Sequence, residues 1–410
     1  MPTINKKQII LLALAFLALV AIGFDAYLVA TRHHSSGSLH SGMGITEYAK
    51  AMEDRCKDAP YRPTCYEQQV PTLVSDLPVE RIFDVIRQIR QDDPEYLYCH
   101  VLAHKLGEYE VSLDPSKWLD VIAKGPTDGL CSNGFAHGAI VTRFHDEELS
   151  PEEFQFALKD LDKACEERPG WTPTDLMKAI CYHGIGHVLI HMTEAKIAES
   201  LAACEQVALK SDGRDYRQLC TEGVYMQLFQ PLEPEDFALI DKLPFKPTRD
   251  TLQKFCTENS SSTDQYGACW REGWPLVGDD LYTSDGLQNY CGAITDEKNQ
   301  QLCYVSAFTI NGRHYLEDPQ KMAEDCNAMP EQYQGMCFSR GANAFPEEDP
   351  NLVTKGVALC GMADSDAAKD ECYRFLANVA SFNFHPGSQP FETLCSALPE
   401  TYQEACRNGH

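Results

Sequence analysis

The sequence has no Cys-x-x-Cys pair and little positive charge. Its 18 cysteines therefore lack the spacing typical of zinc ribbons and thioredoxin-like redox motifs. The 35 Lys and Arg residues are outnumbered by 61 Asp and Glu residues, which gives a formal net charge of -26. Because nucleic-acid backbones and anionic membrane surfaces repel a polyanion, we expect no nucleic-acid partner.

Several catalytic fingerprints are missing as well. No GxSxG, P-loop or GxGxxG pattern occurs in a suitable strand–helix context, so we expect no nucleotide cofactor. The HExxH metalloprotease pattern and the CxxCH haem-attachment motif are also absent. What remains is a chain with ordinary hydrophobic (43%) and charged (23%) fractions, which is typical of a folded protein rather than a disordered one.

The cysteines and the N-terminus indicate the compartment. An even number of cysteines without metal-binding spacing favours nine disulfide bonds in an oxidising environment. Lys6 and Lys7 precede an apolar run from Ile9 to Ala30, about 20 residues long, which is enough to span a bilayer as a helix. A cleaved signal peptide usually has a shorter apolar core, so an uncleaved anchor is favoured over cleavage after Ala30.

We therefore predict a single-pass protein, with residues 1–30 as membrane anchor or signal and residues 31–44 as a flexible spacer. In this prediction the protein contacts the membrane only through this N-terminal helix. The rest of the chain is expected to be periplasmic or extracellular, because the lysines precede the apolar run.

The cysteines are periodic. The second members of the later pairs recur every 34 or 35 residues, which is typical of stacked repeats. The seven expected repeat pairs are Cys165 with Cys181, Cys204 with Cys220, Cys256 with Cys269, Cys291 with Cys303, Cys326 with Cys337, Cys360 with Cys372, and Cys395 with Cys406. Cys56 and Cys65 form a separate N-terminal pair. Cys99 and Cys131 are left, and a bond between them is favoured over free thiols or metal ligands.

Each repeat is predicted to be a helix, a turn and a second helix, because the segments after the second cysteines show no strand alternation. The first cysteine would end one helix and bridge to the cysteine that opens the next. The predicted fold is all-α: disulfide-stapled two-helix repeats in a solenoid or compact array, with about eight hairpins. Residues 45–98 would form a helical cap, 99–220 His-rich repeats and 221–410 C-terminal repeats.

The repeat resembles Sel1-like and tetratricopeptide-type α/α repeats, in the style of secreted cysteine-rich Sel1-like proteins. The segments Lys163-Ala164-Cys165 and Cys181-Tyr182-His183-Gly184 carry the resemblance, which extends over residues 95–410. It implies a helical solenoid or compact helical array, and it implies nothing about chemistry.

Six of the 13 histidines lie in the opening turns of three successive predicted helices, after Cys99, Cys131 and Cys181: His100, His104, His137, His183, His187 and His191. His100/His104 and His183/His187/His191 are spaced by four, so each set shares one face of its helix. Equivalent positions on neighbouring repeats should line one surface. Glycines such as Gly138 and Gly186 beside them would permit close helix approach.

Imidazole is the commonest metal-ligand side chain, so this pattern predicts a metal site. The expected core triad is His104, His137 and His187. Two further candidate ligands, His183 and His100, lie one helical turn before His187 and His104. Copper, iron and zinc all suit imidazole. Histidines that merely pack at repeat junctions are the alternative. Glu222, Arg271 and Glu272 are assigned to helix junctions, with a ligating Glu222 and an Arg271–Glu272 ion pair as alternatives.

The predicted function is an extracytoplasmic helical-repeat protein that binds a metal, with metal-dependent enzyme activity left open. The alternative is an interaction scaffold whose repeat surface binds a partner protein. A pH sensor built on clustered imidazoles is a third hypothesis.

Overall fold

The computed structural model describes residues 43–93, 99–126, 130–144, 151–231 and 234–409. Within these ranges the regular structure is helical and no β-strand forms, which confirms the all-α prediction. The predicted anchor and nearly all of the spacer lie outside the described residues. No helix within the described ranges is both long enough and apolar enough to cross a membrane.

The N-terminal cap consists of α2 (Ile45–Cys56), α3 (Arg62–Gln69) and α4 (Val79–Asp92), with α2 packed on both of the others. After it, inner and outer helices alternate. The inner helices are α5 (His100–Leu113), α7 (Gly134–Phe144), α9 (Asp175–Met192), α11 (Arg217–Phe229), α14 (Thr263–Glu272), α16 (Glu297–His314), α18 (Glu331–Glu348), α20 (Asp366–Asn383) and α22 (Glu400–Asn408).

The outer helices connect them. These are α6 (Trp118–Ile122), α8 (Pro151–Ala164), α10 (Ile197–Val207), α12 (Pro234–Ile240), α13 (Leu252–Glu258), α15 (Ser284–Gly292), α17 (Pro319–Asn327), α19 (Val353–Gly361) and α21 (Gln389–Ala397). Each inner helix packs on the next inner helix, so a single buried apolar core runs through the repeats.

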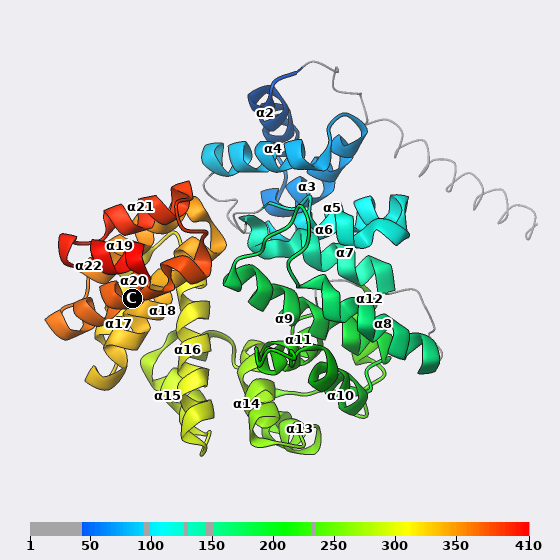
Figure 1. The fold of residues 1–410 in the computed structure, drawn as a ribbon. Helices are drawn as coiled ribbons and strands as arrows, with labels where there is room; N and C mark the ends of the chain where they lie inside the picture. Colours follow the sequence, from blue (N-terminus) through cyan, green and yellow to red (C-terminus); the bar gives the residue numbers. More distant parts are fainter. Residues whose placement is uncertain (1–42, 94–98, 127–129, 145–150, 232–233, 410) are drawn as a thin grey trace, which may run out of the picture.

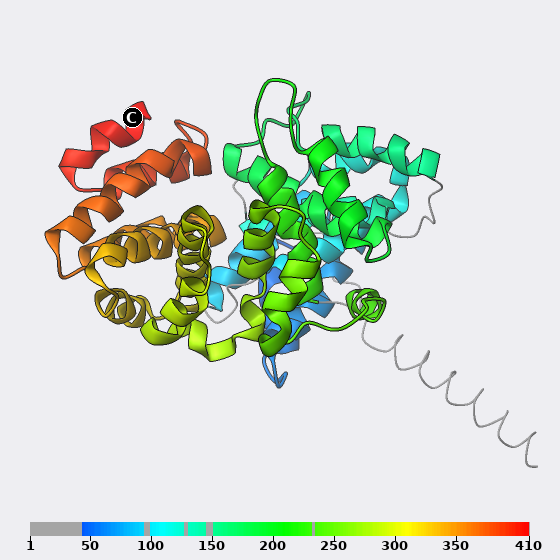
Figure 2. The ribbon, with the colours of Figure 1, turned by 90° about the horizontal axis from the view of Figure 1, so that it is seen from below.

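The repeats curve around the molecule rather than forming an extended rod. Figure 1 shows them following one another from α5 through α14 to α18 and α20. Figure 2 shows the C-terminal helices, in orange and red, returning beside the N-terminal repeats, in green. The ends meet, because α20 contacts α9 and α18 contacts the short helix η3 (Leu130–Asn133). The solenoid is therefore a curved array that closes on itself.

A buried ion pair lies where the ends meet. Arg90 of α4 and Asp349, which follows α18, are 3.3 Å apart, and their side chains are only 3% and 9% exposed. Arg90 also lies 3.4 Å from the sulfur of Cys99. The N-terminal cap is thus bound to the C-terminal repeats by charge as well as by packing.

Nine disulfide bonds form, and they join the cysteines that the sequence pattern pairs. In seven of them the bond joins an outer helix, or the residue just after it, to the following inner helix, whereas Cys99–Cys131 joins the residue before α5 to the short helix η3 that precedes α7. The Cα atoms are 5.6 Å apart at Cys165–Cys181 and 4.8 Å apart at Cys99–Cys131. The other bonds are Cys56–Cys65, Cys204–Cys220, Cys256–Cys269, Cys291–Cys303, Cys326–Cys337, Cys360–Cys372 and Cys395–Cys406.

The predicted starts of the inner helices were wrong in most repeats. The second cysteine of a pair does not open its helix, since α9 begins at Asp175, ahead of Cys181. The prediction holds for α5, which begins directly after Cys99. The cysteines that instead lie inside their inner helices are Cys181 of α9, Cys220 of α11, Cys269 of α14, Cys303 of α16, Cys337 of α18, Cys372 of α20 and Cys406 of α22.

Helix capping explains the earlier starts. Thr174 accepts a hydrogen bond from the backbone N–H of Met177 and so begins α9 ahead of the cysteine. Ser262 caps α14 ahead of Cys269, and Ser365 caps α20 ahead of Cys372. No side-chain cap precedes α22, which begins after Pro399 and ahead of Cys406. The helix starts thus follow local signals that lie before the cysteines.

Candidate functional site: the histidine-lined cavity

The inner helices enclose a cavity of about 1290 Å³. Its walls carry many apolar side chains, among them Phe135, Ile140 and Leu176, together with a smaller set of polar groups. Such a cavity is large enough for a sizeable organic ligand, and its few polar groups would orient that ligand. It is where the titratable side chains described below gather.

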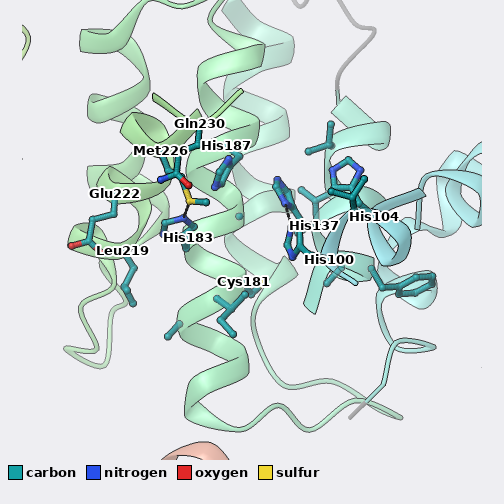
Figure 3. Close-up of a pocket in the computed structure, with 18 of the residues that line it drawn as sticks. His100, His104, His137, Cys181, His183, His187, Leu219, Glu222, Met226 and Gln230 are labelled. Carbon is teal, nitrogen blue, oxygen red and sulfur yellow. Dashed lines mark hydrogen bonds between the residues drawn. The ribbon is translucent and has the colours of Figure 1, made fainter. Parts of the chain in front are cut away.

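All six clustered histidines line this one cavity. His100 and His104 come from α5, His137 from α7, and His183, His187 and His191 from α9. Figure 3 shows the rings of His137 and His187 facing each other between the helices. The structure thus brings together the five residues predicted as metal ligands. His314, to which the sequence pattern assigns no role, lines the same cavity and stacks on Tyr282 with ring centroids 3.9 Å apart.

Glycines bring the histidine-bearing helices together. A Cβ atom at Gly138 would lie 2.0 Å from the carbonyl oxygen of His104, and one at Gly186 would lie 2.0 Å from that of Cys220. Real Cβ atoms do not approach oxygen so closely. Gly138 therefore allows α7 to pack against α5 at a distance that places His104 and His137 in ring contact, and Gly186 allows α9 to pack closely against α11.

His137 is the centre of the cluster. Its ring centroid is 4.8 Å from that of His104, 4.6 Å from that of His187 and 5.6 Å from that of His100. His183 extends the chain, at 5.0 Å from His187. The Nε2 atom of His137 is buried and has no hydrogen-bond partner among the described residues. A buried polar atom without a partner is rare and indicates an interaction not yet accounted for.

The other imidazoles have polar neighbours. His104 Nδ1 lies 3.0 Å from Glu108 Oε1, and His187 Nδ1 lies 2.5 Å from Gln227 Oε1. His191 Nε2 lies 3.2 Å from Asp236 Oδ1. The contacts of His187 and His191 are hydrogen bonds, and such partners fix the tautomer and orientation of an imidazole. The contact of His104 with Glu108 is close but lacks hydrogen-bond geometry.

Burial keeps three of these imidazoles neutral. Desolvation, followed by the proximity of His187 and the other histidines, holds the pKa of His137 well below its ordinary value. Desolvation and then Arg313 lower the pKa of His183 to about 4. Desolvation and then His183 lower the pKa of His187 to about 3. Neutral imidazole is the form that binds a metal ion, so none of these three would have to lose a proton at pH 7.

Spacing also suits metal binding, although the rings are not yet arranged around one point. His100 Nε2 and His137 Nδ1 are 3.3 Å apart. Two nitrogens bound to a tetrahedral zinc ion lie about 3.4 Å apart, since each Zn–N bond is about 2.1 Å. Within the described part of the chain, no three His, Cys, Asp or Glu side chains already form a ligand set. Binding would therefore require imidazole rings to rotate.

A second polar wall comes from α11 and α14. Arg271 Nε donates to Glu222 Oε1 at 3.1 Å, so Arg271 pairs with the preceding inner helix, and the alternative of an Arg271–Glu272 ion pair was wrong. Glu272 faces the cavity and accepts a hydrogen bond from Gln230 Nε2 at 3.4 Å. Desolvation and then Glu222 raise the pKa of Glu272 to about 8, against the opposing effect of Arg271 and Arg313.

The third polar group, Arg313 of α16 and Glu347 of α18, was missed by the sequence reasoning. Arg313 Nη2 lies 3.4 Å from Glu347 Oε2, and both residues line the cavity. A signal for them exists in the sequence. Arg313 and Glu347 stand at the tenth position after Cys303 and Cys337, as His191 does after Cys181. That position faces the cavity in several repeats, because the cysteine fixes the rotation of each inner helix.

These features define an all-α, disulfide-stapled repeat protein whose inner helices enclose a histidine-lined cavity. Comparison with models of protein families, with curated proteins and with solved structures finds no match for this chain. The resemblance to Sel1-like and tetratricopeptide-type repeats therefore rests on the residues quoted for it and receives no further support.

Proposed function

We propose that the cavity binds a transition-metal ion through histidines of α5, α7 and α9. The observation that carries the proposal is His137, a neutral buried imidazole with a partnerless Nε2, in ring contact with His100, His104 and His187. These residues come from three helices, so ligands would converge from different directions. Copper, iron and zinc are the candidate ions.

The charge of the protein supports a cationic ligand. The molecule carries a net charge of -26, and two carboxylates of the cavity wall, Glu108 and Asp236, lie beside His104 and His191. An acidic field raises the local concentration of cations and disfavours anions. If the histidines only packed at repeat junctions, negative charge near them would serve no purpose. Negative charge therefore favours metal binding over packing alone.

Enzyme activity is supported by a separate observation. Beside the histidines the cavity leaves room for a substrate, and it contains a carboxyl group, Glu272, whose raised pKa of about 8 allows it to hold or release a proton near neutral pH. A bound metal would supply Lewis-acid activation of water or substrate. The side chain of Glu272 would then exchange protons with a substrate in the cavity.

Metal analysis tests the proposal directly. We expect the full-length chain, purified in detergent without a histidine tag and with His33, His34 and His40 replaced by alanine, to hold about one transition-metal ion per chain. His137→Ala should lower the bound metal at least tenfold, because it removes the central imidazole. Elemental analysis and competition with a chromophoric chelator measure both quantities.

The matched control is His385→Ala, since His385 does not line the cavity. It should retain the metal. The contradicting result is a metal content below about 0.1 ion per chain. It must be found in protein that was never exposed to chelators and that was then offered Zn²⁺, Cu⁺ or Fe²⁺. In that case a scaffold with structural histidines is favoured, and partner capture that survives His137→Ala would support it.

We also propose that the repeats lie outside the cytoplasm, tethered by the N-terminal segment. The nine disulfide bonds support an oxidising compartment. Access of a membrane-impermeant protease to residues 45–410 in intact cells tests this. Protection of the repeats would contradict it.

A further inference from the structure

A methionine extends the histidine cluster onto α11. His183 Nε2 and the sulfur of Met226 are 3.1 Å apart, and Figure 3 shows the two side chains joined across the cavity wall. Both residues line the cavity, and both are partly exposed to it. A hydrogen bond to a thioether is weak, so this contact alone gives little reason for a methionine to lie there.

The position of Met226 is that of a ligand in the neighbouring repeats. Met226 is the sixth residue after Cys220, while His137 and His187 are the sixth residues after Cys131 and Cys181. The three successive inner helices α7, α9 and α11 thus carry a potential metal ligand at the equivalent position, six residues after the cysteine. The series ends there, because the corresponding residues of the next two repeats are Pro275 and Thr309.

The thioether is the soft ligand in this cluster. All the cysteines are in disulfide bonds, so no thiolate competes with it. Soft sulfur ligands favour monovalent copper, whereas zinc is bound by imidazole, thiolate and carboxylate. With the N and S bond lengths of a tetrahedral site, about 2.0 and 2.3 Å, the two atoms would lie about 3.5 Å apart, so the observed 3.1 Å contact would have to widen slightly around an ion.

We propose that His183 and Met226, with His187, form a binding site for monovalent copper at the α9–α11 side of the cavity. This inference rests on the proposed metal-binding function and specifies the ion. The ring of His187 is 5.0 Å from that of His183, so one ion could contact both imidazoles and the sulfur after small rotations.

The test compares two metals on matched variants of the full-length chain. Cu⁺ affinity is measured by anaerobic competition with bicinchoninate, with ascorbate as the reductant because it leaves disulfides intact. Zn²⁺ affinity is measured by chelator competition on the same protein. Met226→Leu should lower the Cu⁺ affinity at least tenfold and change the Zn²⁺ affinity less than twofold, because leucine keeps the volume and removes the sulfur.

The control is Met177→Leu, since Met177 lies on α9, lines the same cavity and has no recorded contact with a histidine. It should leave both affinities unchanged. X-ray absorption at the copper edge should show a sulfur ligand in the parent chain and none in Met226→Leu. Unchanged Cu⁺ affinity in Met226→Leu, or no sulfur ligand, would overturn the copper site while leaving the histidine site standing. Failure to bind either metal would overturn both proposals.

Discussion

At the scale of single residues, burial decides what the titratable side chains of the cavity can do. His137, His183 and His187 stay neutral and the carboxyl of Glu272 stays protonated to an unusually high pH, both because a charge is costly away from water. The sequence places these residue types at suitable positions in the repeat. It does not show that Arg271 forms its ion pair with Glu222 rather than with Glu272.

Glu272 makes the stability of the fold depend on pH. Its folded-state pKa of about 8 lies above the ordinary value of 4.5, so between these two pH values the native state binds more protons than the unfolded state. The free energy of unfolding should therefore fall as pH rises from about 4.5 to 8. Glu272→Gln, which is uncharged at every pH, should remove this slope and be the more stable protein at pH 8.5.

Urea unfolding at several pH values, followed by circular dichroism, measures the effect. Glu404→Gln serves as the control, because Glu404 is exposed on α22. This variant should follow the parent chain at every pH. Equal slopes for Glu272→Gln and the parent would show that Glu272 is ionised normally.

At the scale of helices, two kinds of sequence signal set the fold. The cysteine period gives the number and order of the hairpins, and the disulfide then fixes the rotation of each inner helix. The starts of the helices follow capping residues such as Thr174 and Ser262, which lie ahead of the cysteine. A capping residue is a local signal, available in the sequence, that the cysteine period obscured.

The close packing of α5 on α7 depends on glycine. In Gly138→Ala the new methyl group would meet the carbonyl oxygen of His104 at 2.0 Å, so the two helices would have to separate. We expect a loss of about 2–4 kcal/mol in the free energy of unfolding. Metal binding should weaken with it, because His104 and His137 would move apart.

Denaturant unfolding and chelator competition measure these two effects. Gly292→Ala is the matched control, since an added Cβ at the end of α15 meets no atom within 4 Å. It should be neutral or stabilise by up to about 1 kcal/mol. A Gly138→Ala protein as stable as this control would show that α5 and α7 tolerate a wider spacing.

At the scale of the whole molecule, the closure of the array turns a repeat surface into a cavity that receives side chains from both ends of the chain. An open solenoid would present the histidines on a concave face, where they would be hydrated. Because α18 and α20 return to η3 and α9, polar side chains from the C-terminal repeats, such as Arg313 and Glu347, face the same cavity as the histidines.

The Arg90–Asp349 ion pair should stabilise this closure. Asp349→Asn keeps the side-chain oxygen that caps η7 (Pro350–Leu352) and removes the charge opposite Arg90. Breaking one side of a buried ion pair leaves the other charge uncompensated, so we expect a loss of about 3 kcal/mol. Amide hydrogen exchange should accelerate in α4 and α18 and remain unchanged in α10.

Lys254→Gln removes an exposed ion pair, to Glu258 at 3.8 Å, and is the control. It should cost less than about 1 kcal/mol. Uniform exchange rates in Asp349→Asn and the parent would show that packing alone holds the ends together.

The sequence by itself determined the helical class, eight of the nine cysteine pairs and the grouping of six histidines on three neighbouring helices, and it favoured the ninth pair, Cys99–Cys131, over free thiols or metal ligands. These follow from local periodicity. A disulfide bond forms only between cysteines that the fold brings close together, and residues four apart share a helix face. Tertiary structure decided that the array closes, that Arg313 and Glu347 meet the histidine wall, and that Met226 approaches His183. Those contacts depend on the small rotation between successive repeats, which adds up over the whole chain. The sequence of a single repeat does not reveal this rotation.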